Sequence, residues 1–390
     1  MKIIENTEDL NALCKELNKQ KFITVDTEFV REKTYFSELC LIQVGWLDDA
    51  AIIDPLVKDI NLEAFFDVLT NQKVLKVFHS GRQDIEIFYN LSGKLPSPIF
   101  DTQIAAMACG FGNSIGYDNL VKFITGVELD KSSRLTDWSK RPLQKKQLEY
   151  ALRDVTFLIP CYEFLNKYLT EHNRHEWITE ETEYLLNEEL YKPQPEKMWL
   201  RIKHSAHSLT FLMVLKDLAA WREERAIRCN IPRKTLLKDE LLVNIASTAP
   251  KNMEELANVR HIKSDIVKGK LGKEILEVVN RALEKPADKN LKKIEKEKQI
   301  NVPANAQSLI ELLKLLLKII SEQNYAVECL IADEKDLRDI ACGNNDKTNR
   351  ALHGWRYEVF GKYALDFRKG KASIHYDNAQ KKIVISNMDV

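Results

Sequence analysis

Two carboxylates near the start of the chain have the type and spacing of metal ligands. Asp26 and Glu28 are separated by one residue in the strand-like segment Lys21–Phe29 (KFITVDTEF). Side chains at positions i and i+2 of a strand point to the same face, so both carboxylates face one spot. They repel each other and lose hydration there, and a divalent cation is the simplest compensation. The pair alone does not prove a metal site, because two such carboxylates could also lie on the solvated polar face of an edge strand.

Two further acidic residues and a tyrosine extend this pattern. Asp84 follows a buried strand-like run at the start of a helix, which is where α/β sheets place their sites. The alternative is a first-turn acid that the helix dipole favours. Tyr150 and Asp154 are spaced i, i+4 and therefore lie on one helical face. An aspartate on an apolar helix face is costly unless it is paired or bound to a metal ion.

The elements that must position these residues alternate between strand and helix in the first part of the chain. Strands are expected at the β-rich runs Lys21–Phe29, Leu39–Trp46, Ala51–Asp54 and Val74–His79, and a short strand is expected within Ile99–Ile104. The first three runs are close enough in the sequence to form an antiparallel meander. Helices are expected at Leu62–Leu69 and Gln83–Leu91. After Ser139 the strand signals fade, and Pro160 should kink or end the helix that carries Asp154. The pattern predicts a mixed sheet covered by helices, an α/β fold.

Composition and charge divide the rest of the chain. Residues 171–200 carry 3 basic and 8 acidic side chains, and residues 284–300 contain 10 charged residues, so both stretches are expected to connect domains. Two helical blocks lie between and after them, and the tail Ile374–Ile385 has weak strand character. The expected organisation is an α/β domain, an acidic connector, a helical domain, a charged linker and a second helical domain with a C-terminal tail, at residues 1–170, 171–207, 208–290, 291–302 and 303–390.

The overall composition is that of a folded globular protein. Of the 390 residues, 44% are hydrophobic and 30% are charged, and no apolar run is long enough to predict a membrane-spanning helix. The start MKIIENTEDL is acidic where a signal peptide would be basic and apolar. Seven cysteines without a C-x-x-C pair predict reduced thiols and a cytoplasmic location. Residues 201–290 carry 18 basic and 12 acidic side chains, which suits either a polyanion partner or ordinary solvated helix faces.

In the order D-x-E, D, Y-x-x-x-D, the five candidate residues resemble the Asp-Glu-Asp-Asp 3′–5′ exonuclease superfamily, in its subtype with a tyrosine. The segments FHSGRQDIEIF, FDTQIAAM and RLTDWSKRPLQKKQLEYALRDVTFL are similar to the bacterial ribonuclease D family, and the string Thr136–Leu143 is specific to that branch. This resemblance covers residues 1–170. It implies a ribonuclease H-like exonuclease domain.

The helical blocks resemble a second domain type. Residues 211–250 are similar to a helicase-and-RNase-D C-terminal (HRDC) domain in the pair Trp221-Arg222, in Asn230-Ile231-Pro232 and at Pro250. The segments AQSLIELLKLLL and GWRYEVFG look like parts of a second, more divergent HRDC domain. The resemblance therefore implies an α/β exonuclease domain followed by two all-α HRDC domains. It also implies an RNA partner, namely tRNA precursors and other RNAs with free 3′ ends.

Hydrolysis of a phosphodiester requires an activated water, a stabilised pentavalent phosphate and a neutralised leaving oxygen, which two metal ions about 4 Å apart can supply. Four carboxylates without thiolate or imidazole suit Mg²⁺ or Mn²⁺. Our hypothesis makes Asp26 the bridging ligand, places Glu28 and Asp154 on the water-activating side, and places Asp84 on the leaving-group side. Tyr150 orients the attacking water, because an ordinary tyrosine pKa near ~10 is high for a general base.

Substrate contacts are predicted on both sides of these acids. By resemblance, Thr27 and Phe29 contact the terminal nucleotide, whereas the alternative for Phe29 is packing. Residues near Asp84 or in the basic segment 131–146 are expected to contact backbone phosphates: His79, Arg82, Gln83, Lys140 and Arg141. A hydrogen-bonded core histidine is the alternative for His79, and Trp138 is expected to anchor its loop.

The basic residues of the first helical block suit a sequence-independent RNA surface or a face that packs on the nuclease domain: Lys216, Arg222, Arg225, Arg228, Arg233, Lys234 and Lys238.

These observations favour a cytoplasmic, monomeric 3′–5′ exoribonuclease that acts in tRNA 3′ maturation, releases 5′-monophosphates and has no membrane partner. A second interpretation keeps the same site but makes single-stranded DNA the substrate, and the absence of a polymerase or helicase region argues against it. A third is an RNA-binding protein with an inactive nuclease fold. The complete set of four acids and a tyrosine argues against that interpretation.

Overall fold

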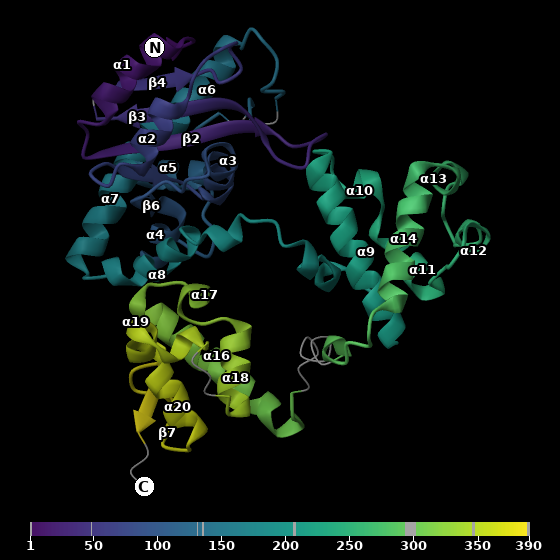
Figure 1. The fold of residues 1–390 in the computed structure, drawn as a ribbon. Coiled ribbons are helices and arrows are strands. Elements are labelled where there is room, and N and C mark those ends of the chain that lie inside the picture. The colour runs from purple at the N-terminus through teal and green to yellow at the C-terminus, as the bar shows by residue number, and fades with distance from the viewer. Residues whose placement is uncertain are drawn as a thin grey trace. The chain divides into compact units, whose positions relative to one another are not determined.

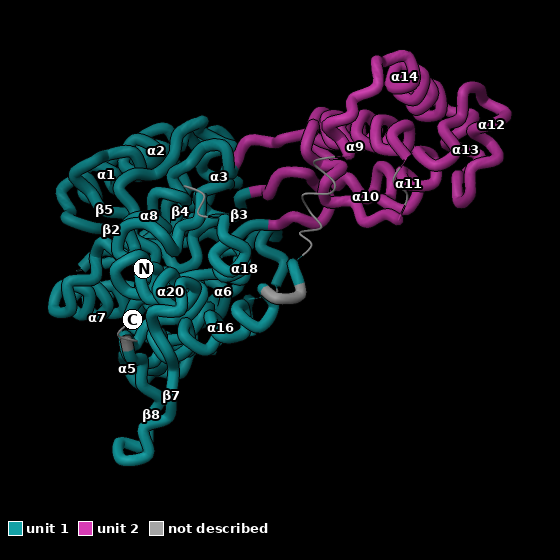
Figure 2. Tube along the Cα trace, turned by 90° about the horizontal axis from the view of Figure 1, so that it is seen from below, with its two compact units in different colours: residues 1–29, 39–190, 302–390 teal, residues 30–38, 191–301 magenta. Residues whose placement is uncertain are grey.

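The computed structural model describes residues 2–47, 49–130, 132–134, 136–205, 208–292, 302–344 and 348–387. The chain forms two compact units. Unit 1 comprises Met1–Phe29, Leu39–Leu190 and Val302–Val390, and unit 2 comprises Val30–Glu38 and Tyr191–Asn301 (Figure 2). The α/β region and the C-terminal block therefore belong to one unit, while the middle helical block and a short segment from the first part of the chain form the other.

A six-stranded mixed sheet is the framework of unit 1 (Figure 1). Its strands are β1 (Lys2–Ile4), β2 (Phe22–Val30), β3 (Glu38–Trp46), β4 (Asp49–Ile53), β5 (Leu75–Phe78) and β6 (Ile99–Asp101). They lie in the order β1-β4-β3-β2-β5-β6. The pairs β1/β4, β2/β5 and β5/β6 are parallel, and β3/β4 is antiparallel. The predicted mixed sheet is confirmed, and β2, which carries Asp26 and Glu28, is an inner strand, not the edge strand of the alternative.

Helices alternate with the strands of the sheet along the chain and then continue after the last strand. They are α1 (Thr7–Leu17), α2 (Glu63–Thr70), α3 (Arg82–Ser92), α4 (Thr102–Ala108), α5 (Tyr117–Thr125), α6 (Lys145–Thr156), α7 (Leu158–Glu171) and α8 (His175–Leu185), followed by the 3-10 turn η1 (Glu188–Leu190). The break between α6 and α7 confirms the effect predicted for Pro160, which fits in the first turn of α7, where no backbone N–H is required.

The helix α6 lies close against β2 and β3 because a small residue makes room for it. The hydroxyl of Thr24 on β2 donates to the carbonyl oxygen of Val155 on α6 at 2.8 Å. A Cβ atom at Gly45 on β3 would come within 2.6 Å of that hydroxyl and 3.1 Å of the carbonyl. A larger residue at position 45 would therefore push apart the two elements that carry Asp26 and Asp154.

Two stretches differ from the sequence-based expectation. The run Ile99–Ile104 is a strand only as far as Asp101, whose side chain accepts hydrogen bonds from the backbone N–H groups of Gln103 and Ile104 and so starts α4. The stretch 171–207, expected to be an acidic connector, contains α8, where Trp177 and Ile178 are buried. Four of its acidic residues, Glu176, Glu180, Glu181 and Glu183, therefore belong to a packed helix.

The C-terminal block of unit 1 is mainly helical. Its elements are α16 (Ala304–Asn324), α17 (Glu328–Ile331), α18 (Glu334–Cys342), η3 (Arg350–Leu352), α19 (Gly354–Arg356), the π-helical turn η4 (Tyr357–Gly361), α20 (Lys362–Arg368), and the antiparallel hairpin of β7 (Ala372–Asp377) and β8 (Lys382–Asn387). This block shares one hydrophobic core with the α/β region. The rings of Trp177 and Trp355 stack with centroids 4.4 Å apart, and the N–H of Val327 donates to the carbonyl of Met107.

Unit 2 is an all-helical core with one attached segment. Its elements are η2 (Pro195–Arg201), α9 (Leu209–Arg228), α10 (Arg233–Leu236), α11 (Asp239–Thr248), α12 (Met253–Ala257), α13 (Ser264–Lys268) and α14 (Lys270–Glu284). Buried apolar residues of α9, α11 and α14 form its hydrophobic core. Residues 293–301 of the predicted linker 291–302 lie outside the described part of the chain.

Two expectations drawn from composition concern the whole chain. All seven cysteines are unpaired, as the sequence predicts. Among the helices that the structure describes, none combines the length and the apolar character that crossing a membrane requires.

Candidate active site

Three of the four predicted carboxylates lie together between β2 and α6. Asp26, Glu28 and Asp154 each offer an oxygen atom, and these atoms all lie within 4.8 Å of one another. Asp26 and Glu28 share one face of β2, and Asp154 comes from α6, which is held against that strand by Thr24. Residues 126 positions apart in the sequence therefore form one carboxylate cluster, which we call the acidic cluster.

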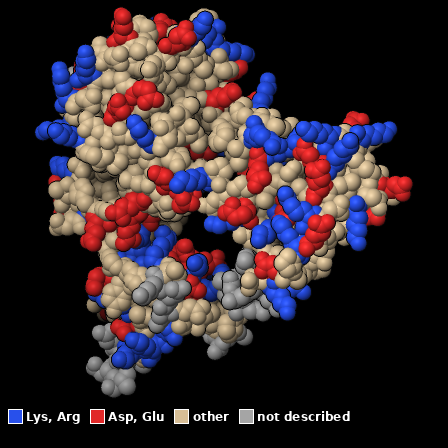
Figure 3. All heavy atoms as spheres, in the orientation of Figure 1, with Lys and Arg blue, Asp and Glu red and all other residues tan. Residues whose placement is uncertain are grey.

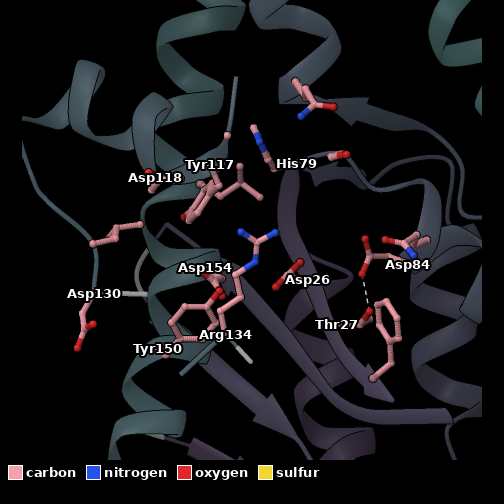
Figure 4. Close-up of a pocket in the computed structure, with 17 residues that line it drawn as sticks. Asp26, Thr27, His79, Asp84, Tyr117, Asp118, Asp130, Arg134, Tyr150 and Asp154 are labelled. Carbon is pink, nitrogen blue, oxygen red and sulfur yellow. Dashed lines mark hydrogen bonds between the residues drawn. The ribbon is translucent and has the colours of Figure 1, made fainter. Parts of the chain in front are cut away.

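Asp84 lies in the same cavity but outside that group. It stands in the first turn of α3, its exposed fraction is 7%, and its Oδ1 atom accepts a hydrogen bond from the hydroxyl of Thr27 (Figure 4). The turn before α3 is held by Asp101, whose carboxylate accepts from the N–H groups of Ser80 and Gly81. Asp101 is thus structural, and it fixes the start of the helix that presents Asp84.

A cavity of about 340 Å³ opens over these groups. Figure 4 shows Asp26, Asp84, Tyr150 and Asp154 around a common space, with the side chain of Arg134 extending into it. The residues that line the cavity include Asp26, Thr27, Phe29, His79, Gln83, Asp84, Tyr117, Asp118, Asp130, Arg134, Tyr150 and Asp154.

The electrostatics of the acidic cluster favour a bound cation. Burial raises the pKa of Asp26, and the nearby charge of Asp154 raises it further. Burial and then the charges of Asp26 and Asp154 raise the pKa of Glu28 to about 10. Burial also raises the pKa of Asp154 to about 7 and that of Asp84 well above its usual range. Because the donors are all oxygen atoms and their negative charges oppose one another, the site fits a hard divalent metal ion.

Tyr150 is placed to donate a hydrogen bond, not to accept a proton. Burial and the charge of Asp154 raise the pKa of Tyr150 above its ordinary value. Its hydrogen bond to Asp154 lowers the pKa of that carboxyl, as expected for a protonated phenol beside a carboxylate. Tyr150 also lies 6.1 Å from the ring of Trp138, which is buried and anchors its loop as predicted.

The predicted substrate contacts divide into two groups. Thr27, Phe29, His79 and Gln83 line the cavity. His79 is nevertheless held within the protein, because its Nδ1 atom lies 2.9 Å from the hydroxyl of Thr102 and its Nε2 atom lies 3.2 Å from a backbone carbonyl. These contacts match the alternative interpretation of His79 as a histidine that is hydrogen-bonded within the protein core.

The other three predicted contacts, Arg82, Lys140 and Arg141, do not line the cavity. Arg141 binds both carboxylate oxygens of Asp54, and its remaining donors go to the carbonyls of Cys40, Trp138 and Lys140. All five N–H groups of this guanidinium are therefore used inside the protein. Arg141 is a structural residue, and we leave it out of the substrate-binding set together with exposed Arg82 and Lys140.

Arg134 and the α5 region were missed by sequence reasoning. Arg134 lies in the cavity, and its positive charge lowers the pKa values of Glu28, Tyr150 and Asp154. It belongs to the basic segment 131–146, but nothing in the sequence separates it from the other five cations there. Tyr117 also lines the cavity, and its hydroxyl donates to the carbonyl of Arg153, which ties α5 to α6. No sequence motif marks that contact.

Comparisons with known proteins place this chain in a family. Residues 1–170 match a 3′–5′ exonuclease family model, and residues 211–279 match an HRDC domain model. The fold is similar to that of Escherichia coli RNase D, described as an exoribonuclease involved in structured RNA processing, with a TM-score of 0.77 and 27% identity over 95% of this chain and 98% of that one.

Two curated relatives are similar over nearly their full lengths. The chain is 42% identical to ribonuclease D of Bartonella henselae, over 97% of its own length and 93% of the relative's. It is 41% identical to ribonuclease D of Nitrobacter hamburgensis, over 96% and 97% of the two lengths. With this identity over almost the whole sequence, the chain belongs to the ribonuclease D family.

Proposed function

We propose that this protein is a divalent-metal-dependent 3′–5′ exoribonuclease that releases nucleoside 5′-monophosphates. The observation that carries the proposal is the acidic cluster of Asp26, Glu28 and Asp154. Asp26 and Asp154 line a cavity that Asp84 and Tyr150 also line. The family membership supports an RNA substrate, since the relatives over the full length are ribonucleases.

Two ions, Mg²⁺ or Mn²⁺, are the cofactors that these donors suit. Asp26 would be shared between them, Glu28 and Asp154 would complete one site, and Asp84 would serve the other. When bound, such ions activate water and neutralise charge on the phosphate oxygens. The four carboxylates, together with Tyr150, fit the tyrosine subtype of the exonuclease superfamily.

The remaining side chains of the cavity act on the substrate and the attacking water. Tyr150 keeps its proton and donates to Asp154, so its hydroxyl can hold a water beside that carboxylate in line with the scissile bond. Arg134 presents a guanidinium that can pair with a phosphate oxygen. Phe29, Thr27 and Gln83 line the space left for the terminal nucleotide, and His79 supports its wall.

The biological setting is also part of the proposal. We propose a monomer acting in the cytoplasm on tRNA precursors and other RNAs with free 3′ ends. The matched HRDC model supports a first HRDC domain in residues 208–290. The helices α16–α20 support a divergent second one in residues 303–390, after an exonuclease domain in residues 1–170.

The direct test uses a 5′-labelled RNA with a stem and a single-stranded 3′ tail. It is incubated with the protein in Mg²⁺, in Mn²⁺ and in EDTA, beside an Asp154→Ala variant and a DNA of the same sequence. We expect a ladder that shortens from the 3′ end, stops at the stem, and disappears in EDTA and in the variant. If the protein binds the RNA but does not cleave it in either metal, an inactive RNA-binding protein is favoured. If it degrades the DNA faster than the RNA, its substrate is single-stranded DNA.

A further inference from the structure

A glutamine on the strand next to β2 is buried without a hydrogen-bond partner. On the visible face of unit 1, Lys, Arg, Asp and Glu side chains lie at the surface, where water can hydrate them (Figure 3). Gln43 on β3 is instead 0% exposed. Neither its amide nitrogen nor its amide oxygen has a partner among the residues that the structure describes. A buried amide without hydrogen bonds costs free energy, so packing alone does not favour a glutamine at this position.

The sheet places Gln43 beside Asp26. β2 and β3 are neighbours in the sheet, and the connection 31–37 is too short for the crossover of a parallel pair, so the two strands run antiparallel. The close approach of Gly45 to the hydroxyl of Thr24 makes these two residues opposite neighbours. Two positions along each strand, Gln43 is then opposite Asp26. Opposite residues of an antiparallel pair point to the same face, with Cβ atoms about 4.5–5.5 Å apart.

That face of the sheet carries the acidic cluster. Asp26 and Glu28 share it, and α6 brings Asp154 against it. The residue paired with Gln43 on the other side is Ile52 of β4, which is fully buried and offers no hydrogen-bonding side chain. Of the two cross-strand neighbours of the Gln43 amide, Asp26 is therefore the one with an acceptor.

The carboxylate of Asp26 can take a further donor. It accepts a hydrogen bond from the backbone N–H of Thr27. An ionised carboxylate has about four lone-pair sites, so two shared ions and one backbone donor leave room for one more hydrogen bond. Carboxylates that bind metal ions are themselves hydrogen-bonded, and these outer partners fix the orientation of the ligand.

We propose that Gln43 is a positioning residue of the metal site, whose amide N–H donates to the Asp26 carboxylate when the ions are bound. The proposal rests on the proposed function, in which Asp26 is the ligand that the two ions share. Gln43 acts through Asp26 and does not contact the RNA, since it is not among the residues that line the cavity. The amide is then unfavourable for the metal-free protein and favourable for metal binding, and the two effects can be measured separately.

The experiment compares Gln43→Leu, which removes the amide at similar volume, with Gln147→Leu on α6. Gln147 is also buried, but its amide donates to the hydroxyl of Thr136 at 3.0 Å and accepts from the N–H of Gln144 at 2.9 Å. Calorimetric titration with Mn²⁺ in the absence of RNA measures the metal affinity of each variant. We expect a Kd for Mn²⁺ that is about 10- to 100-fold weaker in Gln43→Leu and unchanged in Gln147→Leu.

Thermal unfolding in EDTA should move in the opposite direction. Gln43→Leu should raise the melting temperature because it removes an unpartnered buried amide, whereas Gln147→Leu should lower it because it leaves buried partners unsatisfied. Gln43→Met, with an unbranched chain, is the second variant in case leucine does not fit, and it should weaken Mn²⁺ binding equally. An unchanged Kd in both Gln43 variants would overturn the proposal. A weaker Kd with a melting temperature as low as that of Gln147→Leu would also overturn it, because the amide would then support the fold and not the ligand.

Asp154→Ala separates this proposal from the proposed function. If Asp154→Ala binds Mn²⁺ as tightly as the wild type does, the acidic cluster is not the metal site and both proposals fail. If Asp154→Ala loses Mn²⁺ binding while the Gln43 variants keep it, the metal site stands and only the role of Gln43 fails. In turnover at low Mg²⁺, Gln43→Leu should lower kcat and leave the KM for RNA unchanged, because Gln43 does not contact the substrate.

Discussion

The hydroxyl of Thr27 on β2 donates a hydrogen bond to the carboxylate of Asp84 on α3. Both side chains are buried, with exposed fractions of 5% and 7%. Thr27 points to the opposite face of the strand from Asp26 and Glu28, as alternation along β2 requires. The strand that carries two of the carboxylates therefore also positions a third, which comes from a helix 57 residues away.

Replacing Thr27 with valine should slow catalysis by releasing Asp84. Valine keeps the shape but removes the donor, so the buried carboxylate loses the hydrogen bond that lowers its pKa. Removing a partner that orients a metal ligand costs about 10- to 100-fold in metal affinity or activity. We expect a loss of that size in kcat and a higher Mg²⁺ concentration for half-maximal activity.

The matched control is Thr125→Val, which removes a half-buried threonine's hydrogen bond to the carbonyl of Val121 on α5. Its kinetics should stay near those of the wild type. If Thr27→Val raises only the KM for RNA and leaves the metal dependence unchanged, Thr27 contacts the nucleotide, as the sequence had suggested.

Replacing Tyr150 with phenylalanine should slow hydrolysis without weakening metal binding. The phenol remains protonated because burial and Asp154 raise its pKa, so its contribution is a hydrogen bond, not proton removal. General acid–base groups raise the rate of hydrolysis by about 10²- to 10⁴-fold. The loss of a donor that only orients water should slow hydrolysis by a factor at or below the lower end of that range. Single-turnover rates and calorimetric Mn²⁺ titrations measure the two properties separately.

The half-buried tyrosine Tyr162, which packs against Phe22 and Phe100, provides the control as Tyr162→Phe. A Tyr150→Phe rate equal to the wild-type rate at neutral pH would remove Tyr150 from the mechanism.

Local spacing predicted the parts of the site that depend on a single element. The same-face placement of Asp26 and Glu28 follows from the strand period, and that of Tyr150 and Asp154 from the helix period. The mixed sheet also followed from the β-rich runs. Contacts between distant segments were not predictable, because residue type alone does not say which partner satisfies a side chain.

Arg141 shows this limit clearly. In the sequence it is one of six cations in the segment 131–146, and in the structure its guanidinium is fully used by Asp54 and three carbonyls. Arg134, seven residues earlier, is the cation that enters the cavity. Only the tertiary fold distinguishes the two.

Without metal, the acidic cluster should make the protein less stable as pH rises. The folded-state pKa of Asp154 is raised to about 7 from an unfolded value of about 3.8, so its contribution is fully present below the unfolded pKa and is lost as pH rises toward 7. Each proton released in this way costs about 1.4 kcal/mol of unfolding free energy per pH unit. Urea unfolding in EDTA at pH 5, 6, 7 and 8 should reveal the decline, and Mg²⁺ should oppose it.

Asp154→Asn should make this decline shallower, because asparagine has no proton to lose, while Glu28, whose pKa is raised to about 10, keeps part of the slope. The control is Asp130→Asn at the rim of the same cavity, where hydrogen bonds from Ser132 lower the pKa of the aspartate. That variant should retain the wild-type slope. Equal slopes in wild type and Asp154→Asn would mean that Asp154 is ionised throughout this range.

Replacing Arg134 with glutamine should impair catalysis most strongly at low pH. The guanidinium lowers the pKa values of Glu28 and Asp154, so its removal should move the acidic limb of the kcat/KM profile to higher pH. Loss of a charge-assisted contact to phosphate should also reduce kcat/KM on the order of tenfold or more at neutral pH.

Arg134→Lys should recover part of the lost activity, since lysine keeps the charge but not the planar fork. Lys140→Gln is the control, because Lys140 is exposed beside Asp137 and lies outside the cavity. A pH profile that Arg134→Gln does not move would place the guanidinium away from the carboxylates during turnover.

The C-terminal block should be required for the stability of the nuclease part. Arg356 is 1% exposed, and its guanidinium binds Glu180 and Glu181 on α8, while Trp355 stacks on Trp177 of the same helix. Replacing a buried tryptophan with alanine costs about 3–5 kcal/mol. Trp355→Ala should therefore lower the temperature at which dinucleotide hydrolysis is irreversibly lost.

The matched change in unit 2 is Trp199→Ala, which removes a tryptophan of similar burial from the other core. It should destabilise unit 2 while dinucleotide hydrolysis survives heating as in the wild type. The two variants differ in this readout only if the C-terminal block is part of the nuclease core. The N–H of Val327 meets the carbonyl of Met107 at one end of α4, and Asp101 at the other end of that helix holds the turn that presents Asp84. Destabilising the C-terminal block should therefore displace the catalytic carboxylates through α4. Equal thermal inactivation of both variants would show that the block does not support the catalytic carboxylates.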